Sequence, residues 1–265
     1  MNSQIQQKTV GTPAKPDRGT RKGTRLVTLL VGWVPLSVGT RLRNLLYKAV
    51  LHQLGQAVNI QPGVSFLDGG CVEVGDRVRI DPGCALEAQG SSRITLDHQV
   101  FLARDVRISC SKQGQATLAR SVSLDRGVDI KVHGQGRTTI GQHTYIGPYT
   151  CISGYGNITI GKNCLIASHT SLYAHNYNFD DLETPIRQQG YSHKGIQIGD
   201  NCWLGSGARI LDGVTIGAGS IIGAGAVVTK DIPPNAIAVG TPAKVIKMRT
   251  ASQSPPQPGT KRDEN

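Results

Sequence analysis

A six-residue repeat runs through this chain from about Val58 to Pro234. The repeat is clearest near the C-terminal end, where aliphatic residues follow one another at steps of six: Ile198, Leu204, Ile210, Ile216, Ile222 and Val228. Helices repeat apolar residues about every 3.6 positions and strands every two, so neither explains this step. Short strands joined by sharp corners do explain it. The repeat therefore predicts an all-β solenoid rather than a helical or α/β domain.

Three repeats make one turn of the predicted coil. The first aliphatic residues of successive turns are then Val74, Leu96, Leu118, Ile140, Ile160, Ile198 and Ile216. Most turns are longer than three repeats, and the small excesses all fall at the third corner, in Gly-rich or polar segments such as 133–136 and 154–156. Insertions that recur at one corner predict loops stacked along one edge of a three-sided prism.

Positions within each repeat carry a second pattern. The first residue is aliphatic and the fifth is small or β-branched, so we expect both to point inward. Cys84, Cys164 and Cys202 occupy fifth positions, which predicts buried, reduced thiols that act as small apolar residues. The second and fourth positions often hold Gly, Asp or Asn, and we expect them to supply left-handed backbone angles at the corners.

The segments outside the repeat are basic or polar. Residues 1–57 carry nine Lys and Arg against Asp17 alone, and so hold most of the formal charge of +11. We expect residues 1–24 and 249–265 to be disordered, because they are polar and lack periodicity. The basic charge is confined to this flank and lacks a nucleic-acid motif, so no nucleic-acid partner is expected.

Residues 25–57 form a segment of their own. They combine an apolar run that contains Trp33 with a stretch that places Leu42, Leu45, Leu46, Ala49 and Val50 on one helical face. The pattern predicts a helical segment that either caps the open end of the solenoid or lies on an anionic membrane surface. The two interpretations are compatible. Residues 58–248 are then the solenoid domain, with a long loop at 173–195.

The most specific motifs lie in the second half of the repeat. They run from Asn201-Cys202-Trp203-Leu204-Gly205-Ser206 through Ile222-Gly223-Ala224-Gly225 to Gly240-Thr241-Pro242-Ala243-Lys244. In these residues the chain resembles the hexapeptide-repeat acyltransferases. The resemblance implies a left-handed parallel β-helix, acetyl-CoA as acyl donor, and a homotrimer whose sites combine the loop of one chain with the coils of a neighbour.

The long excursion between Leu172 and Ile196 is where we expect the chemistry, because long loops on compact solenoids usually carry function. The resemblance implies that His175 is the catalytic residue. A hydroxyl attacks a thioester efficiently only if a base removes its proton, and an imidazole can do this near neutral pH. Asp180, Asp181 or a backbone carbonyl could orient the ring. His193 is a weaker candidate for acceptor binding, and His169 is expected to be structural.

The same resemblance implies the residues that bind CoA. Trp203 borders the thioester or the pantetheine arm, and main-chain groups of Ser206 and Ala224 bind pantetheine. The remaining residues meet the pantetheine end and the phosphates: Thr229, Lys230, Lys244 and Lys247. No metal is expected, because the histidines do not converge in the way that a zinc site of the γ-carbonic anhydrase type needs.

The stretch from His175 to Ile186 most resembles enzymes that O-acetylate sugars in polysaccharide and lipopolysaccharide assembly, including colanic-acid, maltose and galactoside acetyltransferases. It implies an acetyl transfer to a sugar hydroxyl. Two alternatives stay open: an antibiotic O-acetyltransferase of the streptogramin type and a non-catalytic β-helix scaffold. The expected location is cytoplasmic, with peripheral contact to the inner face of the cell membrane through residues 25–55.

Overall fold

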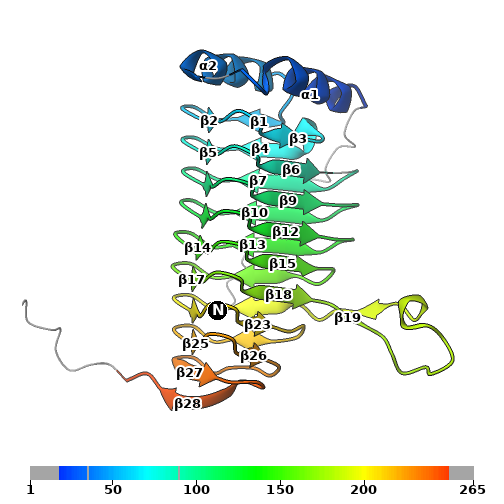
Figure 1. Cartoon of the computed structure of the whole chain (residues 1–265), viewed down its shortest axis with the longest axis vertical. Coiled ribbons are helices and arrows are strands. Elements are labelled where there is room, and N and C mark those ends of the chain that lie inside the picture. The colour runs from blue at the N-terminus through cyan, green and yellow to red at the C-terminus, as the bar shows by residue number, and fades with distance from the viewer. Residues whose placement is uncertain (1–17, 35, 89, 251–265) are drawn as a thin grey trace, which may run out of the picture.

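The chain folds into a three-sided parallel β-helix, seen side-on in Figure 1. The computed structural model describes residues 18–34, 36–88 and 90–250. Successive strands pass from a first to a second and then a third sheet, so that every third strand is hydrogen-bonded in parallel. This confirms the predicted all-β class, a left-handed parallel β-helix of hexapeptide repeats.

The three sheets run the length of the coil. The first contains β1 (Gln53–Leu54), β4 (Val72–Val74), β7 (Arg93–Leu96), β10 (Gln115–Leu118), β13 (Arg137–Ile140), β16 (Ile158–Ile160), β21 (Ile196–Ile198) and β24 (Thr215–Ile216). The second contains β2 (Asn59–Ile60), β5 (Arg79–Ile80), β8 (Phe101–Leu102), β11 (Ser123–Leu124), β14 (Tyr145–Ile146), β17 (Leu165–Ile166), β22 (Trp203–Leu204), β25 (Ile221–Ile222), β27 (Ala236–Val239) and β28 (Lys244–Met248). The third contains β3 (Ser65–Phe66), β6 (Ala85–Ala88), β9 (Arg107–Cys110), β12 (Asp129–Val132), β15 (Cys151–Gly154), β18 (Ser171–Ala174), β23 (Arg209–Ile210) and β26 (Val227–Val228).

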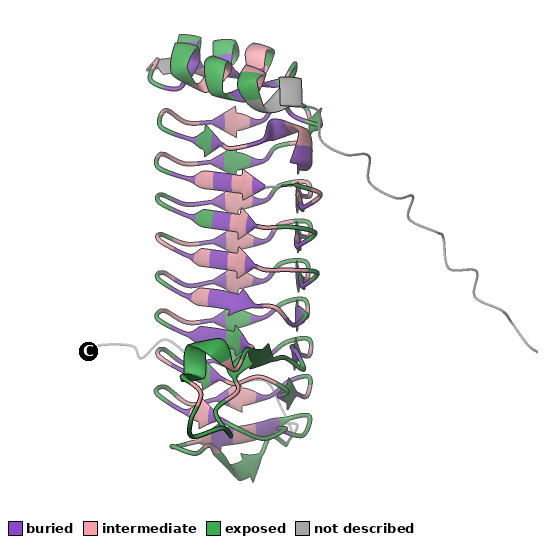
Figure 2. Ribbon diagram, turned by 90° about the vertical axis from the view of Figure 1, so that its right-hand side faces the viewer, coloured by how far each residue is buried: buried purple, intermediate pink, exposed green. Residues whose placement is uncertain are grey.

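Inward residues form columns of like side chains along the axis. One column in the second sheet consists of Leu102, Leu124, Ile146, Ile166, Leu204 and Ile222, all fully buried and paired in register. Along a strand, these buried residues alternate with intermediate or exposed ones, as Figure 2 shows. Each such side chain contributes roughly 1.5–3 kcal/mol by burial. The predicted inward cysteines Cys84, Cys164 and Cys202 are buried and free.

The second and fourth positions of the repeat, at the corners of the coil, are constrained in different ways. The fourth position of a repeat takes the left-handed backbone angle, as at Asn201 (φ 56°) and also at the non-glycine Arg77 (φ 56°). The second position does not. Gly199 is small because a Cβ there would lie 2.5 Å from the backbone nitrogen of Ala218 in the next coil. The expectation that both positions supply left-handed angles is therefore wrong for the second, where close approach of stacked corners is the constraint.

Two helices, α1 (Arg18–Val31) and α2 (Leu36–Tyr47), lie across the first coil and cap it (Figure 1). The buried Arg43 donates hydrogen bonds to Ile60 O (2.8 Å) and Val34 O (2.6 Å), and Asn44 donates to Val58 O (2.6 Å). Val34 O lies in the turn between the helices, whereas Val58 O and Ile60 O belong to the first coil. Each later coil accepts hydrogen bonds from N–H groups of the coil before it, but no coil precedes Val58 O and Ile60 O. Polar side chains of the cap thus replace the missing strand.

The helical segment differs from the prediction in two respects. Helix α1 begins at Arg18, inside the region expected to be disordered, and Thr24 is buried. The side of α2 that faces the coil carries Arg43 and Tyr47, whereas Leu42 and Leu45 are exposed. The coil itself begins at β1, before the expected residue 58. Neither described helix is long and apolar enough to cross a bilayer.

The C-terminal end is closed by a hairpin instead of another coil. Strand β28 runs antiparallel to β27, with Lys247 opposite Ile237 and Lys244 opposite Val239. All residues of β28 are exposed. The C-terminal tail expected at 249–265 falls outside the described residues beyond residue 250.

Candidate functional site

The long loop leaves the coil after β18 and returns at β21 (Figure 1). Its base is a short antiparallel hairpin of β19 (Asn176–Tyr177) and β20 (Tyr191–Ser192), and its tip contains a 3₁₀ turn, η2 (Ile186–Gln188). Another 3₁₀ turn, η1 (Gly69–Cys71), lies in the first coil. The loop returns at Lys194 and Gly195, whose backbone N–H groups donate to the carboxylate of Asp212 at 2.8–2.9 Å. Asp212 therefore anchors the loop to the next coil.

His175 is the first residue after β18, at the corner between the third and first sheets. We call this corner the loop edge; it is formed by the segments 111–114, 133–136 and 154–157 and by the two ends of the loop. The His175 ring makes edge contacts with Tyr155 and Tyr177, at centroid distances of 5.6 and 6.0 Å. Its Nδ1 is buried and has no hydrogen-bond partner among the described residues. The residue as a whole is half-buried.

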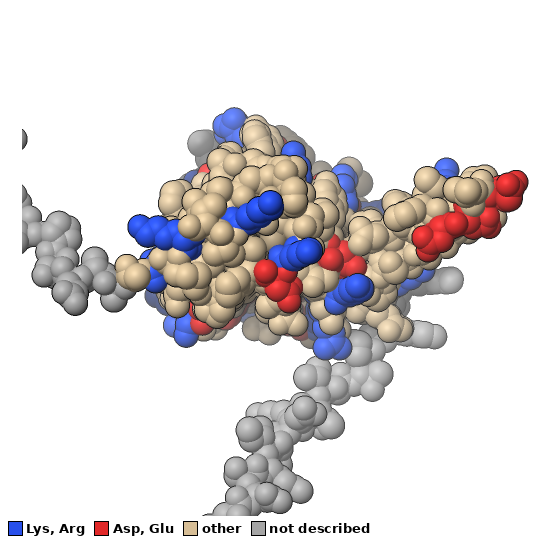
Figure 3. Space-filling view, turned by 90° about the horizontal axis from the view of Figure 1, so that it is seen from below, with Lys and Arg blue, Asp and Glu red and all other residues tan. Residues whose placement is uncertain are grey.

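The acidic residues of the loop do not orient this ring. The Asp181 carboxylate accepts hydrogen bonds from the backbone N–H of Glu183 (2.9 Å) and Thr184 (3.3 Å). Hydrogen bonds from Thr184 and Glu183 lower the Asp181 pKa. Asp180 is exposed near the loop tip. The tip is acidic, as Figure 3 shows where the loop projects from the body, and its acidic residues are Asp180, Asp181 and Glu183.

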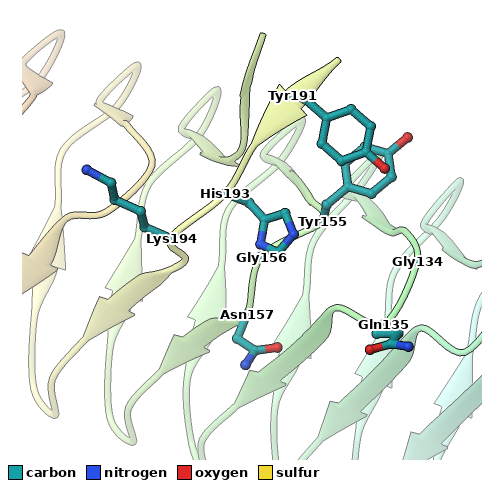
Figure 4. A pocket seen from close by; sticks show the side chains of 8 residues that line it. All are labelled: Gly134, Gln135, Tyr155, Gly156, Asn157, Tyr191, His193 and Lys194. Atoms are coloured by element: carbon teal, nitrogen blue, oxygen red, sulfur yellow. The ribbon is translucent and has the colours of Figure 1, made fainter. Parts of the chain in front are cut away.

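A cleft of about 390 Å³ lies along the loop edge. His175 is not among its lining residues, but it contacts Tyr155, which is. It is lined by Gly134, Gln135, Tyr155, Gly156, Asn157, Tyr191, His193 and Lys194. The rings of Tyr155 and Tyr191 are stacked at 3.9 Å, and Figure 4 shows them together above His193 while Lys194 points away. Aromatic faces combined with amide groups suit a ligand with both apolar and hydroxyl-bearing sides.

His133 links this cleft to the catalytic candidate. Its ring lies 5.0 Å from that of Tyr155. Burial, followed by the nearby His175 and Lys131, lowers the pKa of His133 below its ordinary value. His133 is therefore mainly neutral near pH 7, which leaves its ring able both to donate and to accept a hydrogen bond. Neither His133 nor Tyr155 was predicted as a site residue. Their one signal in the sequence is that both lie in corner insertions.

The predicted CoA residues lie elsewhere in the chain. Ser206 and Ala224 stack at the corner between the second and third sheets, which we call the serine edge. The Ser206 hydroxyl lies 2.8 Å from that of Ser168 in the preceding coil and donates to Ser168 O at 2.9 Å. Ser206 and Ala224 are both exposed there. Within one chain the third sheet separates the serine edge from His175.

The remaining predicted CoA residues are also exposed. Trp203 lies on β22 in the second sheet, with 52% of its surface exposed, and borders a shallow hollow of about 160 Å³. Thr229 and Lys230 follow β26 at the loop edge near the C-terminal end, and Lys244 and Lys247 lie on β28. Arg249, which the sequence analysis missed, lines the hollow beside Trp203. Its only sequence signal is the basic run 244–249.

Comparisons with known proteins identify the repeat. The bacterial transferase hexapeptide family, described as six repeats, matches residues 195–230. The chain carries hexapeptide repeats of the bacterial transferase type. Among curated proteins, the hexapeptide-repeat chain is 34% identical over 154 residues to "Probable acetyltransferase Rv3034c" of Mycobacterium tuberculosis (strain ATCC 25618 / H37Rv), covering 58% of this chain and 51% of that protein.

Further similarities agree with this. A Schizosaccharomyces pombe (strain 972 / ATCC 24843) protein with a provisional acetyltransferase name, C18B11.09c, is 50% identical over 91 residues, which cover 34% of this chain and 42% of that protein. The hexapeptide-repeat chain thus spans about half or less of the curated relatives it matches. The crystal structure of the polySia specific acetyltransferase NeuO has the same fold, with a TM-score of 0.57, 24% identity, and coverage of 76% of this chain and 90% of that one.

Proposed function

We propose that this chain is an acyltransferase that moves an acetyl group from acetyl-CoA to a sugar hydroxyl in exopolysaccharide or lipopolysaccharide synthesis. The observation that carries the proposal is the position of His175: it lies at the base of the long loop, its Nδ1 is buried, and its ring contacts Tyr155, which lines the aromatic cleft. The acetyltransferase names of the relatives support the reaction class.

The proposed reaction needs a base, His175, and a polarised carbonyl, that of the acetyl-CoA thioester. Nε2 of His175 accepts the proton of the acceptor hydroxyl while its oxygen attacks the thioester carbonyl carbon. Backbone N–H groups stabilise the resulting oxyanion. The carbon–sulfur bond then breaks, the acetyl group stays on the acceptor oxygen, and the imidazolium returns its proton to the CoA thiolate. No covalent acyl-enzyme is needed.

The acceptor site is the cleft on the loop edge. Sugars present an apolar face and a hydroxyl-bearing rim, which match the stacked Tyr155 and Tyr191 and the polar side chains of Gln135 and Asn157. His193 borders the same cleft and contributes to acceptor binding. This assignment keeps the acceptor and His175 on the same edge of one chain.

The donor site lies on the serine edge of a second chain. Trp203, Ser206 and Ala224 bind the pantetheine arm, and the basic side chains of Lys244 and Lys247 on β28 meet the phosphates. Thr229 and Lys230 lie at the loop edge, so they reach the pantetheine end and the phosphates from the chain that supplies His175. Because the serine edge and the loop edge are separated within one chain, a complete site needs two chains side by side, and three chains close the ring as a trimer. The loop supports this arrangement, because three of its large apolar side chains are exposed: Phe179, Leu182 and Ile186.

The direct test is His175→Ala, with release of free CoA measured on acetylation of a panel of sugar and glycan acceptors. We expect turnover to fall roughly 10²- to 10⁴-fold while CoA binding is retained. The matched control is His169→Asn, because His169 has a φ of 59° that asparagine tolerates. Wild-type turnover in His175→Ala would remove the histidine from the mechanism. Transfer to an antibiotic but to no glycan would favour the alternative acceptor, and failure to bind CoA would favour a scaffold.

Mixing variants tests the shared site. His175→Ala and Trp203→Ala chains, each nearly inactive alone, are unfolded together and refolded as mixed assemblies. Some sites then combine an intact His175 from one chain with an intact Trp203 from its neighbour, so we expect partial recovery of turnover. A monomeric mass in solution, or no recovery in mixed assemblies of confirmed composition, would contradict the intersubunit site.

A further inference from the structure

The outer side of the cap presents an unusual concentration of apolar surface. Seven large apolar side chains of α1, α2 and the turn between them are exposed, and we call them together the outer cap face: Leu26, Leu29, Leu30, Trp33, Val38, Leu42 and Leu45. Leu29 is 74% exposed and Trp33 is 72% exposed. Figure 2 shows the outer side of both helices as exposed. A concentration of exposed apolar side chains on two adjacent helices marks a candidate interaction site.

Capping does not explain these residues. The cap is held on the first coil by other side chains, chiefly Arg43 and Tyr47, both fully buried. The Tyr47 ring packs against Phe66 at 4.9 Å, and its hydroxyl lies 3.2 Å from that of Thr28. The backbone N–H of Gly63 in the first coil also donates to Gly32 O at 2.7 Å. The coil is therefore sealed without using the outer cap face.

The charge around the outer cap face has one sign. The described side chains Lys22, Arg25, Arg41 and Lys48 are exposed on these helices or next to them. The sequence has no Asp or Glu from residue 18 to residue 67. The exposed apolar side chains of the loop tip have acidic neighbours instead, whereas those of β28 (Val245, Ile246 and Met248) lie among the basic residues that we assign to CoA. An anionic partner therefore fits the cap and not the loop.

We propose that the outer cap face is a membrane-docking surface that lies on an anionic lipid bilayer, with α1 and α2 parallel to the bilayer plane. A basic helix pair with Leu and Trp on its outer side has the composition of an interfacial element. Trp residues favour the headgroup level, where Trp33 would sit. The helices have 14 and 12 residues, so they lie on the membrane rather than span it.

A second copy of the chain fits the outer cap face less well. Two caps placed face to face would bring their basic residues together, which is unfavourable. A side-by-side trimer would instead place three caps at the same end and increase membrane affinity by multivalency. The β-helix would then stand on the bilayer with the loop five coil steps, about 24 Å, beyond the first coil. The docking proposal holds for a monomer as well and does not depend on the acetyl-transfer proposal.

The test measures binding of the full chain to vesicles by sedimentation. One set consists of phosphatidylcholine alone and the other of phosphatidylcholine with 30 mol% phosphatidylglycerol (about a third anionic lipid, to give a negative surface potential). We expect binding to the anionic vesicles, weakened by raising the salt concentration because the Lys and Arg contacts are screened. The variant Leu29→Ser/Trp33→Ser/Leu45→Ser should bind at least about tenfold more weakly.

The matched control is Phe179→Ser/Leu182→Ser/Ile186→Ser, which removes the same number of exposed apolar side chains from the loop tip. We expect it to bind anionic vesicles clearly more tightly than the cap variant. Any loss relative to the unchanged chain should be matched by a smaller mass in solution, because the loop tip also supports the assembly. Circular dichroism and thermal unfolding verify that both variants are folded. A Trp203→Phe chain, in which Trp33 is the remaining tryptophan, should show a blue shift of its emission on anionic vesicles and none on neutral ones.

Several results would overturn the proposal. These are no binding to either vesicle, equal binding to both, and unchanged binding of the folded cap variant. A fall in the solution mass of the cap variant, without vesicle binding by the unchanged chain, would assign the face to contacts between copies. No vesicle binding by the full chain, with strong binding once residues 1–17 are removed, would show that this segment occupies the face.

Discussion

The coil and the long loop use apolar residues in opposite ways. Inward residues of the coil such as Ile130 and Leu124 are fully buried within the chain. In the loop, Leu182 is 94% exposed and Phe179 is 66% exposed. The loop is nevertheless ordered, because Asn178 and Gln189 side chains donate hydrogen bonds to loop carbonyls at 2.7–3.0 Å. The coil is thus complete in one chain, whereas the loop is built to be covered by something else.

The largest expected difference between the two regions is in stability. Ile130→Ala should lower the free energy of unfolding by about 2–5 kcal/mol, because it leaves a cavity in a column of stacked side chains. Leu182→Ala should change it by less than about 0.5 kcal/mol in the isolated monomer. Denaturant unfolding of both variants measures the contrast. A comparable loss in Leu182→Ala at low protein concentration would mean that the loop packs within its own chain.

The anchor of the loop should affect activity more than stability. Asp212→Ala removes the acceptor of two backbone N–H groups, at Lys194 and Gly195. We expect turnover to fall about tenfold, which corresponds to about 1.4 kcal/mol and lies within the roughly 1–3 kcal/mol cost of leaving such groups unsatisfied. The control is Asp76→Ala, which removes an acceptor for the N–H of Gln56 far from the loop. Equal turnover in the two variants would show that the loop position does not depend on Asp212.

The smallest expected effect is a pH dependence of stability at the loop edge. The pKa of His133 is lowered in the folded chain, so the folded state binds fewer protons than the unfolded state. The contribution of neutral His133 to the free energy of unfolding is complete above the unfolded pKa of about 6.5. It is lost as the pH falls through the lowered pKa of the folded state. Thermal unfolding between pH 7.5 and 5 should show a decline that His133→Asn reduces. The same decline in both chains would assign it to other groups.

The sequence predicts the coil well because its physical signal is local and repeated. Each strand of the three sheets needs an inward aliphatic residue, so such a residue recurs at every sixth position, as Ile198, Leu204 and Ile210 show. The second-position glycines were misinterpreted because their constraint is the distance to the next coil, and such a distance has no local sequence signal. The sequence did not show which side of α2 faces the coil, because the buried Arg43 satisfies coil carbonyls that no helical pattern represents.

The site is predictable only in part. The sequence by itself determined a three-sided coil with stacked corner loops, one long loop, and a histidine at its start, because periodicity and its interruption are properties of the chain. Only the tertiary structure decided that Tyr155 contacts His175 and is itself packed against Tyr191 and His133, and that Ser206 and Ala224 lie on another edge. Those relationships depend on which corners stack in space, and residues about twenty positions apart become neighbours only once the coil has closed.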